Sequence, residues 1–373
     1  MATAQTTSGL IEDSRHLLGS KWVIDVVRYQ PTERPIEDRW SYAYDKISSR
    51  LIVGVYDGHG GSSCAEHISK VLPQALLGRP PAQHATVFEE IDSRLMKKFT
   101  DDHSLLRPKS SNWMTHAKVA KSGCMALVCD FDLKSMTATI SNAGDCRLAI
   151  VRKDKVASGG PEYTVVYETT DLNARAVAER ERVAKEHPGE DMVLVSGRLF
   201  GRLMSTRGFG DVYYKLPCSG PLGKFTHKRY INALSAAEDP GKVPMNEQYE
   251  SFFYGYRTPP YITPRPEPST ASVNAGDIVI LASDGLWDRL TTQDATSAVW
   301  SGLRAEIPNL AGSLLQSAMD RHPPGDDTTI VVLRCVTEED EGVFSANATG
   351  GKWYSRKMTP TLLSHNPESK VIA

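Results

Sequence analysis

The stretch that decides the fold is Leu51–Tyr56, with the sequence LIVGVY, which runs directly into Asp57–Gly61, with the sequence DGHGG. A continuous β-branched run of this length predicts a strand buried on both faces. The carboxylate of Asp57 therefore stands where a buried strand meets a glycine-rich turn. The same pattern, a buried apolar run beside an acidic turn, occurs again further along the chain.

Two other apolar runs meet acidic residues. Ile278–Ser283 (IVILAS) leads into Asp284, and Asp326 and Asp327 stand just before Thr328–Leu333 (TTIVVL). Carboxylates at the ends of such strands can gather at one edge of a sheet. Unpaired carboxylates gathered there cost several kcal/mol to desolvate and therefore need a cation. An all-oxygen acidic cluster suits Mg²⁺ or Mn²⁺ and not zinc, so the pattern predicts a metal-dependent hydrolase.

The turn after Leu51–Tyr56 is the sharpest local signal. Asp57 can bridge two cations through its two oxygens, and the missing side chain of Gly58 lets its carbonyl approach a metal. His59 then stands close enough to move protons in a reaction. The alternative is a glycine-rich turn with a solvent-exposed histidine.

Further acidic residues have weaker signals when each is taken alone. Glu37 and Asp38 are adjacent, so on a strand they point to opposite faces; alone they favour a solvated charge pair. Asp145 ends Asn142–Asp145, a stretch that favours a hairpin turn. Asp288 lies four residues after Asp284, and one helical turn between them would bring the two carboxylates together. The alternative for Asp288 is a solvated acid in the first turn of a helix.

The stretch Thr206–Asp211, with the sequence TRGFGD, is an unusual turn. Arg207 and Asp211 can meet across a tight bend, and we expect them to form a structural ion pair.

Composition excludes several classes of protein. The chain has 373 residues, 40% of them hydrophobic, and Lys+Arg of 43 against Asp+Glu of 45 gives a net charge of −2. This balance favours neither nucleic acid nor an anionic membrane as a partner, and no apolar run approaches the roughly 20 residues that span a bilayer. We expect reduced, mostly buried thiols of an intracellular protein and no disulfide framework. The cysteines are Cys64, Cys124, Cys129, Cys146, Cys218 and Cys335.

Strand and helix signals alternate from Lys21 to Val336 without strict βαβ order, which predicts an α+β domain on antiparallel sheet. Residues 1–20 are expected to be flexible, residues 218–268 to form an insert, and residues 337–373 to be a polar tail. Besides the runs above, the expected strands are Trp22–Tyr29, Arg39–Tyr44, Met125–Phe131, Thr137–Ser141 and Arg147–Val151. The expected helices are Ser63–Leu76, Thr86–Phe99 with Thr86 as N-cap, one within Thr170–His187 with Asn173 as N-cap, Thr292–Leu303 and Leu310–Met319.

Taken in order, these segments resemble the 2C-type metal-dependent protein phosphatases. The segments that carry the resemblance are PIEDR (Pro35–Arg39), VYDGHGG (Val55–Gly61), SNAGDCR (Ser141–Arg147), STRGFGD (Ser205–Asp211), LASDGLWD (Leu281–Asp288) and DDTTIVV (Asp326–Val332). PIEDR, the doubled aspartate and the Thr258–Tyr261 string (TPPY) are similar to the mitochondrial pyruvate dehydrogenase phosphatase branch.

The resemblance implies a four-layer sandwich of two antiparallel β-sheets flanked by α-helices, with a binuclear Mg²⁺ or Mn²⁺ site. It implies hydrolysis of phosphoserine and phosphothreonine in a protein substrate, such as pyruvate dehydrogenase, by a metal-activated water. Asp57 would bridge the metals, the Gly58 carbonyl would bind one, and Asp284 and Asp326 would bind the other. Glu37 and Asp38 would hold metal-bound waters, Asp145 and Asp288 would serve a third, weaker metal, and His59 would protonate the leaving oxygen.

The chain departs from the family pattern at three positions. The family often has a phosphate-binding arginine where this chain has Glu33, and Arg34, one residue on, is the candidate for that role. Asp327 stands where many members have Asn, and Leu172 where many have His. Neither of these two removes an implied ligand.

Four alternatives stay open. A catalytically silent scaffold would have lost ligands, whereas Asp57, Asp284 and Asp326 remain; a nuclease would be expected to carry a basic groove. The aromatic-rich insert 218–268 serves either as a docking platform or, as we favour, as a packing flap. The branch implies the mitochondrial matrix, but residues 1–20 hold Arg15 beside Glu12 and Asp13, unlike a transit peptide, so the cytoplasm is the alternative.

Overall fold

The computed structural model describes residues 10–18, 22–105, 108–153, 163–219, 223–237, 255–335 and 356–358. The chain divides into two compact units, each built from separate stretches of sequence. The first unit comprises Met1–Ile36, Ala149–Val166 and Asn274–Ala373, and the second comprises Glu37–Leu148 and Tyr167–Val273.

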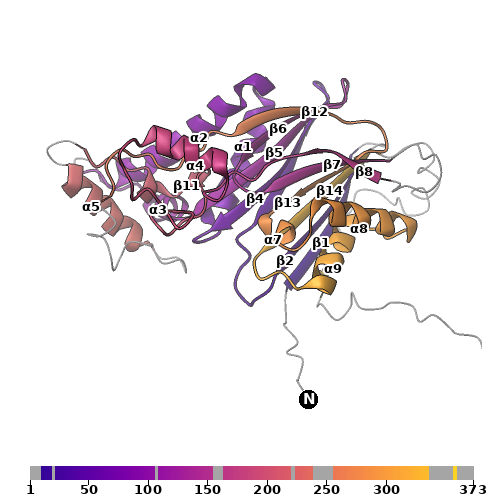
Figure 1. Ribbon diagram of the computed structural model, residues 1–373. Helices are drawn as coiled ribbons and strands as arrows, with labels where there is room; N and C mark the ends of the chain where they lie inside the picture. Colours follow the sequence, from indigo (N-terminus) through magenta and orange to yellow (C-terminus); the bar gives the residue numbers. More distant parts are fainter. Residues whose placement is uncertain are drawn as a thin grey trace, which may run out of the picture. The chain divides into compact units, whose positions relative to one another are not determined.

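The first unit is built on a sheet of seven strands in the order β15-β1-β2-β14-β13-β7-β8 (Figure 1). Its strands are β1 (Leu10–Leu18), β2 (Trp22–Gln30), β7 (Arg147–Lys153), β8 (Tyr163–Glu168), β13 (Ile278–Ala282), β14 (Thr328–Cys335) and β15 (Arg356–Met358). The pairs β15–β1, β1–β2, β2–β14 and β14–β13 are antiparallel.

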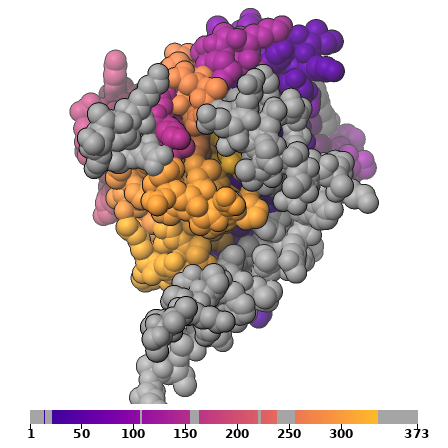
Figure 2. Space-filling model, turned by 90° about the vertical axis from the view of Figure 1, so that its right-hand side faces the viewer, coloured from indigo at the N-terminus to yellow at the C-terminus, as the bar shows by residue number. Residues whose placement is uncertain are grey.

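Helices α8 (Thr292–Arg304) and α9 (Leu310–Arg321) cover one face of this sheet. Their apolar faces, including Val299 and Leu314, pack on alternate strand residues such as Val27 and Ile280. Alternation with period two along a strand and with period 3.6 along a helix produces this match. Figure 2 shows the two helices as an orange outer face of the unit.

The second unit is built on a sheet in the order β12-β6-β5-β4-β3, with β11 paired to β5. All its pairs are antiparallel. The strands are β3 (Arg39–Asp45), β4 (Arg50–His59), β5 (Gly123–Asp132), β6 (Thr137–Ala143), β11 (Phe209–Gly210) and β12 (Glu267–Ser272). Two very short strands, β9 (Leu194–Val195) and β10 (Arg198–Leu199), form a separate hairpin.

Helices α1 (Ser63–Leu77) and α2 (His84–Asp102) cover one face of the second sheet and lie side by side (Figure 1). Smaller elements complete the unit: η1 (Pro81–Gln83), α3 (Trp113–Lys121), α4 (Val177–Glu186), η2 (Val212–Tyr214) and α5 (Gly223–Ser235). The shared core contains Tyr56, Phe88 and Phe99, each fully buried.

The predicted α+β class is confirmed: two large antiparallel sheets, each with its own helix layer, provide the two sheet layers and two helix layers. Cys64, Cys124, Cys129 and Cys146 are buried and Cys218 is half-buried, in agreement with the prediction of mostly buried thiols. No helix among the described residues is long and apolar enough to cross a membrane.

Several local predictions were wrong. Helix α2 begins at His84, so Thr86 lies inside it, and α4 begins only at Val177, so Asn173 is not its N-cap. Instead the Asn173 side chain accepts a hydrogen bond from the backbone of Arg175 in a turn before the helix. Strand β1, which lies within the stretch expected to be flexible, was not predicted from the sequence.

Part of the insert is described. Tyr256 and Tyr261 are buried in the same core as Tyr214, and Ile231 of α5 joins them. This favours packing for the described part of the insert. Phe252, Phe253 and Tyr254, which under the docking alternative could also line a binding surface, lie outside the described residues.

Candidate metal centre

Strand β4 carries Asp57 to the edge of the second-unit sheet. In register across β5, Asp57 lies opposite Met125, and Tyr56 opposite Ala126, which in turn pairs with Ala143 of β6. Because β4 and β6 both run antiparallel to β5, they end at the same edge. Asp57, which is 8% exposed, and Asp145, two residues beyond β6, therefore share one edge of the sheet.

Asp145 is built into this edge as a buried carboxylate. It is 3% exposed; its Oδ2 accepts a hydrogen bond of 2.8 Å from Nδ2 of Asn173, whereas its buried Oδ1 has no hydrogen-bond partner among the described residues. Burial raises the pKa of Asp145 above its ordinary value, and the hydrogen bond from Asn173 opposes this only in part. A nearby cation would favour the ionised form and satisfy the free oxygen.

The chain before β3 lies against Gly58. A side chain at Gly58 would bring a Cβ within 2.5 Å of the carbonyl oxygen of Glu37, so this position requires glycine. Asp38 is 1% exposed, and Glu37 is half-buried. Neither lies on a strand, because β3 begins at Arg39; the expectation that they point to opposite faces of a strand was wrong.

His59, the last residue of β4, contacts Asp211. Nε2 of the ring lies 2.7 Å from Oδ2 of Asp211, whose side chain is 2% exposed. Burial alone lowers the pKa of His59, but the negative charge and hydrogen bond of Asp211, with Glu37 and Asp145 further off, outweigh it, so the pKa is raised. The partner of His59 was missed because it stands 152 residues away in sequence.

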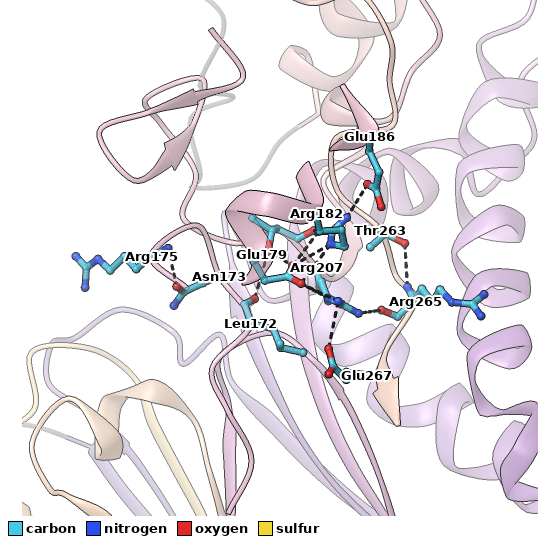
Figure 3. A network of polar contacts seen from close by, with 11 residues as sticks. Leu172, Asn173, Arg175, Glu179, Arg182, Glu186, Arg207, Thr263, Arg265 and Glu267 are labelled. Carbon is cyan, nitrogen blue, oxygen red and sulfur yellow. Dashed lines mark hydrogen bonds and ion pairs between the residues drawn. The ribbon is translucent and has the colours of Figure 1, made fainter. Parts of the chain in front are cut away.

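The predicted ion pair between Arg207 and Asp211 was wrong. Arg207 instead contacts Glu179 of α4 through Nε at 3.0 Å and Nη2 at 2.7 Å, and donates to the carbonyl of Arg265 at 3.0 Å (Figure 3). Glu179 also accepts from Thr206 at 2.6 Å. Because the guanidinium group of Arg207 pairs with Glu179, the carboxylate of Asp211 contacts His59 instead.

In the first unit, Asp284 opens α7 (Asp284–Trp287) directly after β13. The backbone N–H of Asp288 donates to the carbonyl of Asp284 at 2.8 Å, which confirms the predicted helical turn between the two acids. Asp284 is half-buried and Asp288 is exposed.

Asp326 belongs to the same end of the first-unit sheet. Ala282 pairs with Ile330, and Ser283 donates its backbone N–H to the carbonyl of Thr329 at 3.0 Å, so the chain at Asp284 runs beside the start of β14. A Cβ at Gly285 would lie 2.2 Å from the carbonyl oxygen of Asp327. Asp326 is exposed, and its Oδ1 accepts the backbone N–H of Asp327 at 2.8 Å.

Arg34 lies in the exposed loop after β2, where its backbone N–H donates to Oγ1 of Thr32 at 3.2 Å. Thr32 in turn donates to Oε1 of Gln30, whose Nε2 donates to Asp327. These contacts order the loop, but they do not involve the guanidinium group. The phosphate-binding role of Arg34 stays a prediction.

The donor set fits hard divalent cations. In each unit the acids stand at one end of a sheet, their ligand atoms are oxygens, and the buried Oδ1 of Asp145 lacks a hydrogen-bond partner within the described part of the chain. Oxygen donors of this kind suit Mg²⁺ and Mn²⁺.

Comparisons with known proteins agree with this chemistry. The family model described as "Protein phosphatase 2C" matches residues 24–322. The mitochondrial pyruvate dehydrogenase phosphatase 1 of Saccharomyces cerevisiae is 30% identical over 284 residues, covering 71% of this chain and 46% of that protein. The human enzyme of the same name is 27% identical over 333 residues, covering 72% of this chain and 59% of its own length.

A solved structure has a similar fold. The crystal structure of a phosphatase from a pathogenic strain of Toxoplasma gondii matches with a TM-score of 0.58 at 14% identity, covering 94% of this chain and 99% of that one. At this identity the match shows the fold, and it agrees with the predicted α+β sandwich.

The chain belongs to the protein phosphatase 2C family, whose members depend on Mg²⁺ or Mn²⁺. The resemblance predicted from the sequence motifs, including the pyruvate dehydrogenase phosphatase branch, is confirmed. The chain spans about half the length of the curated relatives that it matches, with 46% for the yeast and 59% for the human protein.

Proposed function

We propose that this protein is a metal-dependent serine/threonine protein phosphatase, with residues 21–336 as its catalytic domain. The observation that carries the proposal is the edge of the second-unit sheet, where the buried Asp57 and Asp145 share one end with His59. Such a cluster is costly without a cation and is useful with one.

The proposed ligand roles follow the family pattern. Asp57 would bridge two cations, with the carbonyl of Gly58 on one of them and Asp284 and Asp326 on the other. Glu37 and Asp38 would orient bound waters, and Asp145 and Asp288 would hold a third, weaker cation. When bound, the cations supply an activated water and neutralise charge on the phosphoryl group during in-line attack.

The chain's own residues would complete the reaction. His59 donates a proton to the serine or threonine oxygen as its bond to phosphorus breaks, which turns a poor leaving group into a neutral alcohol. Arg34, in the exposed loop, is the candidate that grips the phosphate, because its planar guanidinium fits phosphate oxygens.

The names of the relatives suggest the substrate and the location. We propose phosphorylated pyruvate dehydrogenase as the substrate and the mitochondrial matrix as the compartment, with the cytoplasm as the alternative. Docking of the substrate or a partner on the insert 218–268 stays the alternative to its packing role, and the feature that supports it is Phe225 of α5, whose side chain is 61% exposed.

Phosphate release tests the proposal. The purified chain is assayed on a phosphothreonine peptide with Mn²⁺ or Mg²⁺, with and without excess chelator, beside Asp284→Ala and the surface control Asp101→Asn. We expect release that requires metal, collapses in Asp284→Ala and survives in the control. No release under any metal, from protein shown to be folded, would instead favour the catalytically silent scaffold.

A separate assay tests the substrate. Initial rates on phosphorylated pyruvate dehydrogenase are compared with rates on an unrelated phosphoserine protein such as casein. A preference for pyruvate dehydrogenase supports the branch assignment. Equal rates would leave the enzyme class intact and contradict the proposed substrate.

A further inference from the structure

The contact between His59 and Asp211 determines which ring nitrogen can serve the substrate. An ionised carboxylate only accepts hydrogen bonds, so Nε2 of His59 carries the proton that lies toward Oδ2 of Asp211, 2.7 Å away. Within the described residues this is the one hydrogen bond that the ring makes. Nδ1 is therefore the nitrogen left for a reacting group.

Gly123, the first residue of β5, makes this contact possible. It pairs with His59 of β4 on one side and with Gly210 of β11 on the other. A Cβ at Gly123 would lie 2.1 Å from Nε2 of His59 and 2.2 Å from Oδ2 of Asp211. Any side chain at this position would therefore occupy the space in which the two groups meet.

The loop that carries Asp211 is held from several directions. The backbone N–H of Gly210 donates to Oδ1 of Asp92 at 3.0 Å, and that of Asp211 donates to the carbonyl of Ser122 at 3.1 Å. The hydroxyl of Tyr213 donates to Oδ1, the other carboxylate oxygen of Asp211, at 3.1 Å. Asp211 itself adopts a left-handed conformation, with φ of 47°. An arrangement with this many constraints fixes the direction of one carboxylate.

We propose that Asp211 is a positioning residue for His59, and that the absence of a side chain at Gly123 is what lets it act. The inference rests on the proposed phosphatase function. The pair keeps Nε2–H on Asp211 and presents Nδ1–H to the leaving oxygen. As water attacks phosphorus and the P–O bond to the side chain breaks, the proton on Nδ1 moves to the departing oxygen. The ring becomes neutral and retains its proton on Nε2.

Two substrates with different leaving groups test this role. A serine or threonine oxygen needs the proton, whereas p-nitrophenolate, a weak base, leaves without it. We expect Asp211→Asn to lower kcat on a phosphothreonine peptide by about 10²-fold and kcat on p-nitrophenyl phosphate by less than about fivefold. KM for both substrates should change little. In a His59→Asn background, Asp211→Asn should cause no further loss on the peptide.

Gly123→Ala provides an independent test that leaves both partners in place. The added methyl should separate them and reproduce the split between the two substrates. Gly312→Ala in α9 is the matched control, because its Cβ would meet no atom closer than 4.0 Å. We expect the control to match the wild type on both substrates. Thermal unfolding of each variant checks that it is folded.

NMR of the metal-free, ¹⁵N-histidine-labelled protein gives a readout without turnover. The wild type should show an Nε2–H signal of His59 protected from exchange with water, assigned by its loss in His59→Asn. The signal should disappear in Asp211→Asn and in Gly123→Ala.

Three outcomes overturn the inference: equal losses on both substrates in folded Asp211→Asn, no loss on either, or an unchanged Nε2–H signal in that variant. If the wild type hydrolyses neither substrate while the NMR signal is present, the proposed function fails and the positioning role for catalysis falls with it. The pairing would then be purely structural.

Discussion

The acids of the two units differ in how the fold holds them. In the second unit, Asp57 and Asp145 are 8% and 3% exposed and stand at strand ends set by the register of β4, β5 and β6. In the first unit, Asp326 and Asp288 are exposed and Asp284 is half-buried, and all three lie just after β13 or just before β14. Burying a carboxylate costs desolvation free energy that only a cation or a hydrogen bond offsets, whereas an exposed carboxylate stays hydrated. We therefore expect the buried Asp57 of the second unit to be essential and the exposed acids of the first unit, Asp326 and Asp288, to adjust metal affinity.

The largest effect is expected at Asp57. Asp57→Asn removes the charge of the bridging ligand, and we expect a loss of at least about 10³-fold in kcat, equivalent to roughly 4 kcal/mol of transition-state stabilisation. Raising Mn²⁺ should not restore activity, because water cannot replace a buried bridging carboxylate. The measurement is kcat on a phosphothreonine peptide over a wide range of Mn²⁺ concentrations.

Asp326→Asn should behave differently. Water can take the place of an exposed ligand, so we expect about 10- to 100-fold weaker activation by Mn²⁺, with much of kcat recovered at saturating metal. The Mn²⁺ concentration that gives half-maximal rate is the quantity to compare. If Asp326→Asn is as inactive as Asp57→Asn at every metal concentration, the proposed difference between the two units is wrong.

The polar network around Glu179 should affect stability more than turnover. The Arg207, Arg182 and Thr206 contacts outweigh the opposing effect of burial and lower the pKa of Glu179 to about 2. A lowered pKa stabilises the fold above the ordinary value of 4.5, and this contribution, roughly 3 kcal/mol, is lost as the pH falls from there toward 2. Glu179→Gln should flatten the acid-unfolding curve in this window.

Glu267→Gln is the matched control for the Glu179 variant. Glu267 contacts the same Arg207 at 3.5 Å, but its side chain is 60% exposed. We expect a change of less than about 0.5 kcal/mol in the free energy of unfolding, measured by urea denaturation. Equal losses in the two variants would show that burial of Glu179 is not what gives the network its strength.

The smallest effect on activity is expected at Asp327. Its carboxylate accepts a hydrogen bond from Nε2 of Gln30, and the amide oxygen of an asparagine can accept the same bond. We expect Asp327→Asn to change kcat/KM by less than about threefold, or about 0.6 kcal/mol. A large loss would mean that the charge of Asp327 serves the metals directly.

Local sequence patterns predicted the strands and the strand-end acids well. Leu51–Tyr56 lies within β4 and Ile278–Ala282 forms β13 because their β-branched residues suit burial on both faces. The glycines at 58 and 285 are required by close backbone contacts. The roles proposed for these acids come from the family resemblance and not from any single motif.

Long-range partners could not be predicted in the same way. Arg207 and Asp211 are four residues apart, which suggested a local ion pair. In the folded chain Arg207 instead contacts Glu179, and Asp211 contacts His59. The start of α4 was also misplaced, because Asn173 is a good N-cap residue by type but bonds within a turn and to Asp145. In each case tertiary contacts override a sound local preference.

The path of the chain has a consequence for dissecting the protein. It passes from one compact unit to the other at 36/37, 148/149, 166/167 and 273/274, so neither unit is a continuous piece of polypeptide. A truncation after residue 148 would keep Asp57, His59 and Asp145 but remove Asp211, and no single cut yields the first unit alone. A single cut can therefore separate the acids of one unit from those of the other, but no single cut releases either unit complete and by itself.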